Sequence, residues 1–121
     1  MLGAAKLTTF LATWDLTKAR RFYEGTLGLR CVSEDQFALV FDANGIPLTI
    51  QKVERLSPRG GLGWTVESVD ATVSELTKRG VIFERPGFLK LSASCIWTSP
   101  DGTKIAWFKD PDGNLINLTG K

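Results

Sequence analysis

Apolar and polar positions along the first half of the chain predict one strand, one helix and three further strands. Residues 7–13 are rich in β-branched and aromatic side chains, which favours a strand. Asp15 follows as the expected N-cap of a helix, because apolar residues recur behind it at helical spacing as far as Gly25. Three apolar segments come next, at residues 30–33, 36–41 and 47–51, and an Asn-Gly turn joins the last two.

The second half repeats this order. A strand is predicted at residues 63–67, and Asp70 is expected to cap a helix that ends at Gly80. The apolar positions of that helix, which we expect to be buried, are Val69, Val73 and Leu76. Further strands are predicted at residues 81–83, 95–98, 104–108 and 114–118.

The two halves match as an internal repeat. Asp15 with its helix corresponds to Asp70 with its helix, 55 positions later, and residues 44–50 correspond to residues 112–118, 68 positions later. Such a duplication predicts two modules whose half-sites face each other. Residues 52–62 lose all periodicity and contain Ser-Pro and Gly-Gly, which is typical of a linker. We therefore expect one domain over residues 1–121, with module 1 at about 5–52, a linker at about 53–62 and module 2 at about 63–121.

The composition is ordinary for a soluble domain. The chain has 121 residues, 43% hydrophobic and 23% charged, and is long enough to bury a real core. Its net charge of +2 is near balance and its basic residues are scattered, so neither nucleic acid nor an anionic membrane is expected as a partner. No stretch is long enough to span a membrane, and the first residues do not resemble a signal peptide, so we expect a cytoplasmic protein.

The chain contains no histidine, which removes the commonest general base and the commonest neutral metal ligand. Its two cysteines, Cys31 and Cys95, lie in apolar, strand-like contexts. A catalytic thiol needs a base nearby, so both cysteines are predicted to be small buried hydrophobic residues.

Three segments together resemble a known family. Residues 15–29 contain the Asp15 cap, a Phe-Tyr pair and a Leu-Gly-Leu exit, residues 69–81 contain Val-Asp, a helix and Gly-Val, and residues 110–118 read Asp-Pro-Asp-Gly-Asn-Leu-Ile-Asn-Leu. In this order and spacing they resemble the vicinal oxygen chelate superfamily, the glyoxalase, bleomycin-resistance and extradiol-dioxygenase group. The resemblance implies an α+β fold of two tandem βαβββ modules that form a cupped mixed sheet around a ligand cavity. It also implies a homodimer.

The resemblance implies four positions for metal ligands, two in each module. Counting from the helix caps and aligning the hairpins puts these positions at Thr8, Thr49, Gly63 and Asn117. The metal-using members carry His, Gln or Glu there, whereas Thr, Gly and Asn supply neither the charge nor the donor strength that a transition ion requires. We therefore expect no metal and no other cofactor.

Strand parity predicts the residues that line the cup. If Thr8 faces the cup, the other residues of the lining include Phe10, Thr49, Gln51, Thr65, Glu67 and Asn117. Glu67 is either a general base or an anchor for a cationic ligand, and the alternative is a solvated or Arg-paired carboxylate. The amides of Gln51 and Asn117 are either ligand-orienting groups or simple rim residues.

Four tryptophans are many for this length. Trp97 and Trp107 are expected on facing strands of one hairpin, where two indoles would form a platform for a planar ligand, and core packing is the alternative. Trp14 and Trp64 are predicted to pack in the core, as are Phe22 and Tyr23. Lys104 and Lys109 are expected to be surface charges.

Three functions stay open at this point. The first is metal-free binding and sequestration of a small molecule, with a planar or aromatic ligand favoured by the tryptophans. The second is an enzyme of the same fold, a lyase or oxidoreductase of the glyoxalase or dioxygenase type, with an atypical or metal-independent site. The third is a non-catalytic regulatory subunit whose cup is filled by its own side chains.

Overall fold

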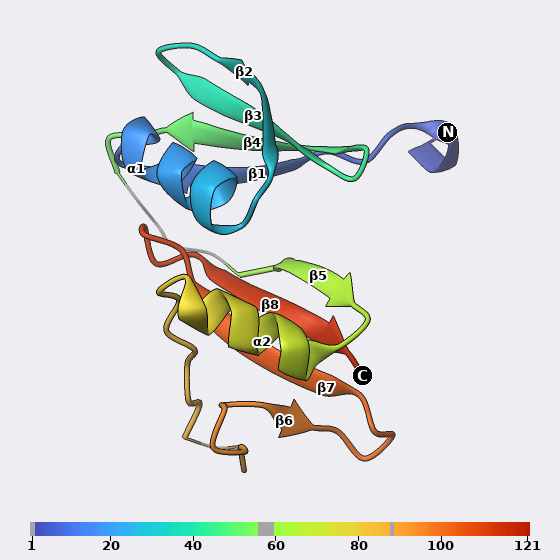
Figure 1. Ribbon diagram of the computed structural model, residues 1–121. Helices are drawn as coiled ribbons and strands as arrows, with labels where there is room; N and C mark the ends of the chain where they lie inside the picture. The colour runs from blue at the N-terminus through green and yellow to red at the C-terminus, as the bar shows by residue number, and fades with distance from the viewer. Residues whose placement is uncertain (1, 56–59, 88) are drawn as a thin grey trace. The chain divides into compact units, whose positions relative to one another are not determined.

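Each half of the chain folds into a four-stranded mixed sheet with helical segments packed against it (Figure 1). The computed structural model describes residues 2–55, 60–87 and 89–121. These residues divide into two units, unit 1 (Met1–Pro58) and unit 2 (Arg59–Lys121). Both halves follow the predicted order of strand, helix and three strands, which confirms the βαβββ modules. The cup between them stays a prediction.

Unit 1 begins with a short 3-10 turn at Leu2–Ala4 and then forms its sheet. The elements are β1 (Thr9–Thr13), α1 (Leu16–Arg20), the π-helical segment η2 (Arg21–Thr26), β2 (Arg30–Glu34), β3 (Ala38–Ala43) and β4 (Ile46–Lys52). The strand order is β1-β4-β3-β2, with β1 parallel to β4 and the other neighbours antiparallel. The first strand of the unit thus pairs with the last.

The helix of unit 1 begins where the sequence predicts. The Asp15 carboxylate accepts hydrogen bonds from the backbone N–H groups of Thr17 and Lys18, at 2.9 and 3.2 Å. The helical segment then continues through η2 to Thr26. Tyr23 is fully buried, and its ring lies 5.8 Å from that of Phe41 on β3, which confirms its predicted place in the core.

Unit 2 repeats this arrangement. Its elements are β5 (Leu62–Val66), α2 (Val69–Lys78), β6 (Trp97–Thr98), β7 (Lys104–Lys109) and β8 (Leu115–Gly120). The strand order is β5-β8-β7-β6, and β5 runs parallel to β8. The three apolar positions predicted for the helix, Val69, Val73 and Leu76, are all buried. Part of the predicted linker, residues 56–59, lies outside the described residues. β5 begins at Leu62, which was expected to be the last residue of the linker.

The helix of unit 2 is capped by a different residue from the one predicted. Ser68, not Asp70, is the N-cap: its hydroxyl oxygen accepts a hydrogen bond from the N–H of Ala71 at 3.1 Å. Asp70 lies in the first turn and forms an ion pair with Lys104 at 2.5 Å. The helices of the two units are therefore 53 positions apart rather than 55, because Ser68 corresponds to Asp15.

Strand pairing supports this corrected offset. Phe10 pairs with Thr49 across β1 and β4, as Gly63 pairs with Asn117 across β5 and β8. Gly63 therefore corresponds in register to Phe10 and not to Thr8.

The strand predicted at residues 81–83 does not form. Only an isolated bridge joins Phe83 to Phe108, although both rings pack together with centroids 5.4 Å apart. The N–H of Glu84 donates to the carbonyl of Trp107 at 2.8 Å, and the chain then turns away at Pro86. Because proline has no N–H to donate, the segment cannot continue beside β7 as a ladder.

Two other predictions about packing are wrong. Trp14 is 53% exposed, because it lies outside the sheet, directly after β1 ends at Thr13. The cysteines are half-buried rather than buried. Cys31 lies next to a bulge on the edge strand β2, and Cys95 adopts a φ of 65° in the turn before β6. Among the described residues no helix is both long and apolar enough to cross a membrane.

Candidate functional site

Each sheet has a face that packs against its helix and an opposite face, which we call the open face. In unit 1 the residues of the helix face are buried, as Leu11, Leu48 and Ile50 show. Phe10 and Thr49 alternate with them and so lie together on the open face, where Phe10 is 55% exposed.

The remaining predicted residues of unit 1 lie around this pair. Gln51 follows Thr49 on the same face of β4 and is exposed. Thr8 precedes β1, is exposed, and its hydroxyl donates to the carbonyl of Pro47 at 3.4 Å. The Thr8 hydroxyl is thus engaged by the backbone of the neighbouring strand.

The open face of unit 2 carries the predicted polar and aromatic residues in two rows. One row joins Trp107, Asn117 and Gly63 across β7, β8 and β5. The other joins Trp97, Ile105, Thr119 and Thr65 across all four strands. Trp97 and Trp107 therefore lie on the same face in adjacent rows, and both are half-buried. Trp64 lies on the opposite face, beside the buried Leu118. Glu67 follows β5 and is exposed.

Gly63 and Asn117 are in close contact. A Cβ atom at position 63 would overlap the amide oxygen of Asn117 and lie only 2.7 Å from its Cγ. The hydroxyl of Thr119 donates to the same amide oxygen at 3.4 Å. The Asn117 amide therefore occupies the space that a side chain on β5 would need.

The residues at the implied metal positions do not fit a transition ion. Gly63 offers no side chain, and neither does Gly61, which the corrected offset of 53 positions matches to Thr8. Thr8 and Thr49 offer neutral hydroxyls, and the Asn117 amide is a weak donor packed over Gly63. Within residues 2–55, 60–87 and 89–121, no three His, Cys, Asp or Glu side chains gather in an arrangement that could hold an ion.

A cavity of about 390 Å³ opens beside Trp107 in unit 2. We call it the Trp107 cavity; its lining residues are Glu84, Arg85, Pro86, Leu89, Trp107, Lys109 and Leu115. Trp107, Lys109 and Leu115 come from the open face of β7 and β8, and the other four come from the segment that follows the Phe83 bridge. The volume lies within the range of small-molecule sites.

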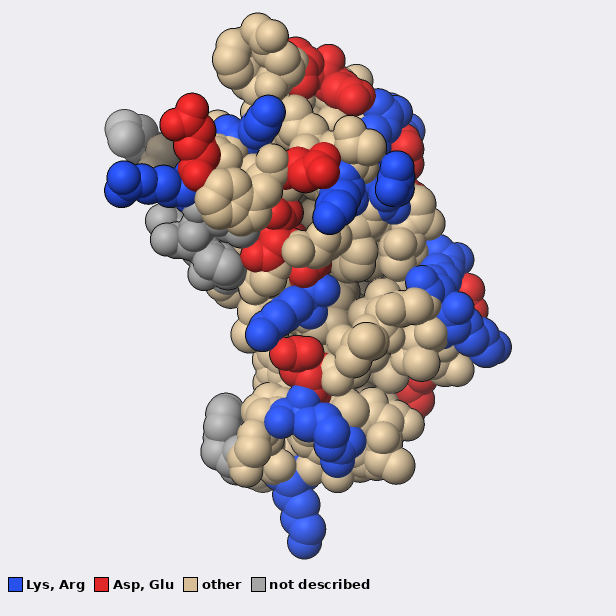
Figure 2. Space-filling view, turned by 90° about the vertical axis from the view of Figure 1, so that its left-hand side faces the viewer, with Lys and Arg blue, Asp and Glu red and all other residues tan. Residues whose placement is uncertain are grey.

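Each charged side chain of the Trp107 cavity has a defined partner. The Lys109 ammonium lies 3.3 Å from the Glu84 carboxylate. The Arg85 guanidinium donates to the carbonyl of Ser92 at 3.2 Å and to the sulfur of Cys95 at 3.0 Å, so its stem lines the cavity while its head group binds the 92–95 turn. On the face drawn in Figure 2, acidic and basic side chains are interspersed rather than gathered into a field of one sign.

Sequence reasoning found part of this lining. The platform hypothesis named Trp107, and the alternation of β7 puts Lys109, two residues later, on the same face, although Lys109 was predicted to be a surface charge. It is 55% exposed but also contributes to the cavity. Glu84, Arg85, Pro86 and Leu89 were missed, because they lie in an irregular segment that carries no periodic signal.

A second cavity, of about 590 Å³, lies along α2 and reaches Lys78, Ile82 and Cys95. Its acidic residue, Asp70, is held by Lys104. It contains none of the tryptophans, so it offers no indole surface to a planar ligand.

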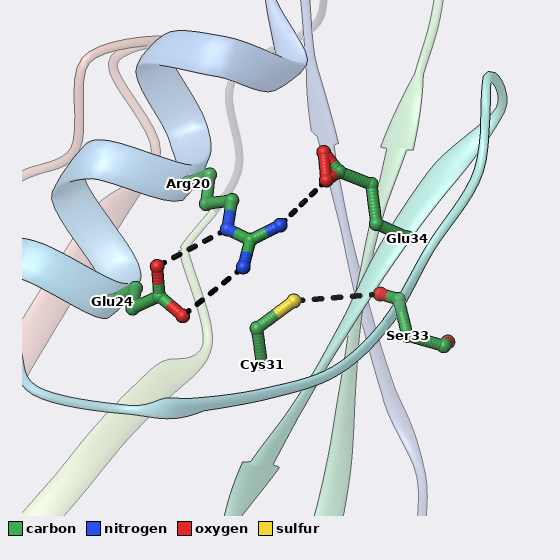
Figure 3. A network of polar contacts seen from close by, with 5 residues as sticks. All are labelled: Arg20, Glu24, Cys31, Ser33 and Glu34. Atoms are coloured by element: carbon green, nitrogen blue, oxygen red, sulfur yellow. Dashed lines mark hydrogen bonds and ion pairs between the residues drawn. The ribbon is translucent and has the colours of Figure 1, made fainter.

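A polar network in unit 1 joins the helical segment to β2 (Figure 3). The Arg20 guanidinium binds Glu24 through Nε at 3.1 Å and Glu34 through Nη1 at 2.6 Å. The hydrogen bond to Glu24, followed by the one to Glu34, raises the pKa of Arg20, so the guanidinium stays protonated. Beside them the Cys31 thiol donates to the carbonyl of Ser33 at 3.5 Å. Because Arg20 engages both carboxylates, we interpret the network as a structural link rather than a site.

Comparisons with known proteins agree on one family. A sequence profile described as the Glyoxalase/Bleomycin resistance protein/Dioxygenase superfamily matches residues 7–118. A solved structure of a member of that superfamily from Sphaerobacter thermophilus DSM 20745 is 25% identical, with a TM-score of 0.76 and coverage of 100% of both chains.

Two more distant structures share the fold. A lactoylglutathione lyase from Agrobacterium tumefaciens is 16% identical, with a TM-score of 0.79 over 97% of this chain and 93% of that one. A glyoxalase/bleomycin resistance protein/dioxygenase from Nocardioides is 20% identical, with a TM-score of 0.74 over 93% and 80%. No curated protein sequence matches this one.

Proposed function

Since this chain belongs to the glyoxalase/bleomycin resistance protein/dioxygenase superfamily, we propose that it binds a small planar molecule without a metal and holds it unchanged. The observation that carries the proposal is the Trp107 cavity, where an indole face and the side chains of Leu89 and Leu115 meet in about 390 Å³. Aromatic and apolar surface of this kind supplies most of the affinity in small-molecule sites. The binding site therefore lies on the open face of unit 2.

The chemistry of the lining favours binding over catalysis. The chain has no histidine, and the donor set at the family's metal positions is too weak for a Lewis acid that would stabilise an enediolate. Within the Trp107 cavity the acidic residue is Glu84, whose carboxylate is engaged by Lys109. Glu67, the candidate base, is exposed beyond the end of β5. Sequestration needs none of these groups to react.

Titration with 2-naphthamide, a neutral planar probe, tests the proposal. We expect saturable quenching of tryptophan fluorescence in the parent protein and severalfold weaker binding in Trp107→Ala, because the loss of the indole removes the principal apolar wall. Trp14→Ala is the matched control, since Trp14 belongs to unit 1 and lines no part of the Trp107 cavity. Equal loss in both variants, or no saturation in the parent, would contradict the proposal. Mass spectrometry of the recovered probe should show it intact.

We further propose that the protein acts in the cytoplasm and that it forms a homodimer, the second of which the family resemblance implies. Unit 1 exposes apolar side chains that a second copy could cover, among them Val32, at 53%, and Phe37, at 68%. Light scattering during size-exclusion chromatography should give twice the 13.3 kDa mass of one chain, and a single-chain mass at every concentration would exclude the dimer.

A further inference from the structure

We propose that the ligand of the Trp107 cavity is an aromatic anion, with its ring against Trp107 and its carboxylate at Lys109. This inference rests on the proposed function and adds the chemical class of the ligand. It depends on the juxtaposition of one indole, one ammonium and an apolar rim inside a single cavity.

Lys109 lines the cavity from the same strand as Trp107. Trp107 and Lys109 stand two residues apart on β7, so both side chains project from the open face of the sheet. Leu115 pairs with Lys109 across β7 and β8 and lines the same cavity. A planar ring that covers the indole therefore places a substituent within reach of the ammonium, while its edge contacts the leucine.

The charged side chains of the lining determine which ligand charge the cavity favours. The cavity is lined by two cationic residues, Arg85 and Lys109, and by one acidic residue, Glu84. Lys109 is held by Glu84 at 3.3 Å, so an incoming carboxylate would either join this pair or replace Glu84 as the partner of the ammonium. Because the Arg85 head group binds the 92–95 turn, Lys109 is the cation left to a ligand, and its ammonium can donate charge-assisted hydrogen bonds to an anion but not to a cation.

The volume of the cavity limits the size of its ligand. About 390 Å³ lies near the small end of the range for ligand sites, which suits a ligand of one or two fused rings. Pro86 and Leu89 add apolar surface to the lining, so we expect the ring of the ligand to contact them and its polar substituent to lie at Lys109. The lining thus distinguishes the two ends of its ligand.

The same strand provides a matched control. Lys104 lies on β7 as Lys109 does, but it projects from the helix face and pairs with Asp70 of α2. Lys104→Gln therefore removes the same charge from the same strand without touching the Trp107 cavity. Any effect of net charge alone would appear equally in both variants.

The experiment compares 2-naphthoate with its neutral amide, 2-naphthamide, by isothermal titration calorimetry. We expect the parent to prefer the carboxylate by roughly threefold to tenfold, and this preference to weaken with added salt, because Lys109 is partly solvated. Lys109→Gln should abolish the preference, Lys109→Arg should keep it, and Lys104→Gln should leave it unchanged. Glu84→Gln should strengthen naphthoate binding, since the competing carboxylate is gone.

The outcomes separate this inference from the proposed function. If naphthamide binds the parent as tightly as naphthoate does, the planar site stands and the anion preference is overturned. The same conclusion follows if Lys104→Gln weakens naphthoate as much as Lys109→Gln does. If neither probe binds, the proposed function itself fails and the inference fails with it.

Discussion

On the open face of unit 2, the Asn117 amide occupies the space that a Cβ atom at position 63 would need. We expect Gly63→Ala to lower the free energy of unfolding by about 1–3 kcal/mol, because the new methyl group overlaps the Asn117 amide. Chemical denaturation of the parent and the variant measures the difference. Asn117→Ala in the Gly63→Ala background should recover part of the loss, since it removes the overlapping amide.

Gly25 provides the opposite case within the same chain. A Cβ atom at this position would meet no atom within 4 Å, and its φ is not in the left-handed region. Gly25→Ala should therefore stabilise unit 1 by about 0.5–1 kcal/mol through the entropy of the unfolded chain. If both substitutions had the same effect, the contact with Asn117 would not be the cause of the loss at position 63.

Strand parity predicted the placement of single residues well where the strand is regular. Thr49 and Asn117 alternate with buried neighbours as expected, because successive side chains of a strand point to opposite faces. Thr65 also alternates as expected, although its neighbours Trp64 and Val66 are only half-buried. Parity fails where the backbone leaves the strand. The exposure of Trp14 and the lining roles of Glu84 and Arg85 depend on irregular segments, whose side-chain directions follow from tertiary contacts that one sequence does not reveal.

At the scale of elements, the turn between β6 and β7 contains a carboxylate with an altered acidity. The Ser99 hydroxyl and then the Thr103 N–H, at 2.9 Å, donate to Asp101 and lower the pKa of its carboxyl to about 2. A carboxyl whose pKa is lowered by folding stabilises the fold above its unfolded pKa, near 4, and this stabilisation is lost as the pH falls through about 2.

Asp101→Asn tests this turn. We expect the variant to melt below the parent near neutral pH, and the difference to narrow as the pH falls from about 4 towards 2. Thermal unfolding followed by circular dichroism at several pH values measures both curves. Ser99→Ala removes the first donor and should reduce the pH dependence in the same direction, whereas a difference that stays constant with pH would contradict the assignment.

The start of α2 offers a test of the corrected repeat. Because the Ser68 hydroxyl accepts the N–H of Ala71, Ser68→Ala should cost about 1 kcal/mol of stability. Ser68→Asp keeps an acceptor at the cap and should restore most of it. Full stability in Ser68→Ala would instead indicate that the cap is supplied elsewhere.

Most elements of the fold were predictable, and the two exceptions have separate causes. Strong periodicity and Asn-Gly or Asp-Gly turns identified both helices and the hairpins, whose local signals agree with their tertiary surroundings. The Asp70 cap was wrong because a carboxylate in a first turn looks like an N-cap in the sequence. The strand at 81–83 was wrong because Pro86, three residues later, cannot donate to β7 and so limits the pairing to an isolated bridge.

At the scale of the whole molecule, the donor set predicts how the protein responds to metal ions. We expect Zn²⁺, Ni²⁺, Mn²⁺ and Fe²⁺ to produce no saturable increase in melting temperature near one equivalent, since Thr8, Thr49, Gly63 and Asn117 are poor donors. Thermal shift assays after treatment with a chelator, paired with elemental analysis, measure this. Stabilisation that saturates at one equivalent of an ion would restore the enzyme interpretation.

The pairing of first with last strand in each unit bears on how the chain folds as it leaves the ribosome. β1 pairs with β4, so the sheet of unit 1 can close before any of β5 has been made. β5 has β8 as its neighbour in the sheet, and the N–H of Val69 behind it donates to the carbonyl of Lys121 at 2.7 Å. Each first strand therefore stays without its partner until the last strand of its unit emerges. This interval is longer in unit 2, where Leu62 pairs with Ile116, 54 residues later, than in unit 1, where Thr9 pairs with Leu48, 39 residues later, so the slower closure is expected in unit 2.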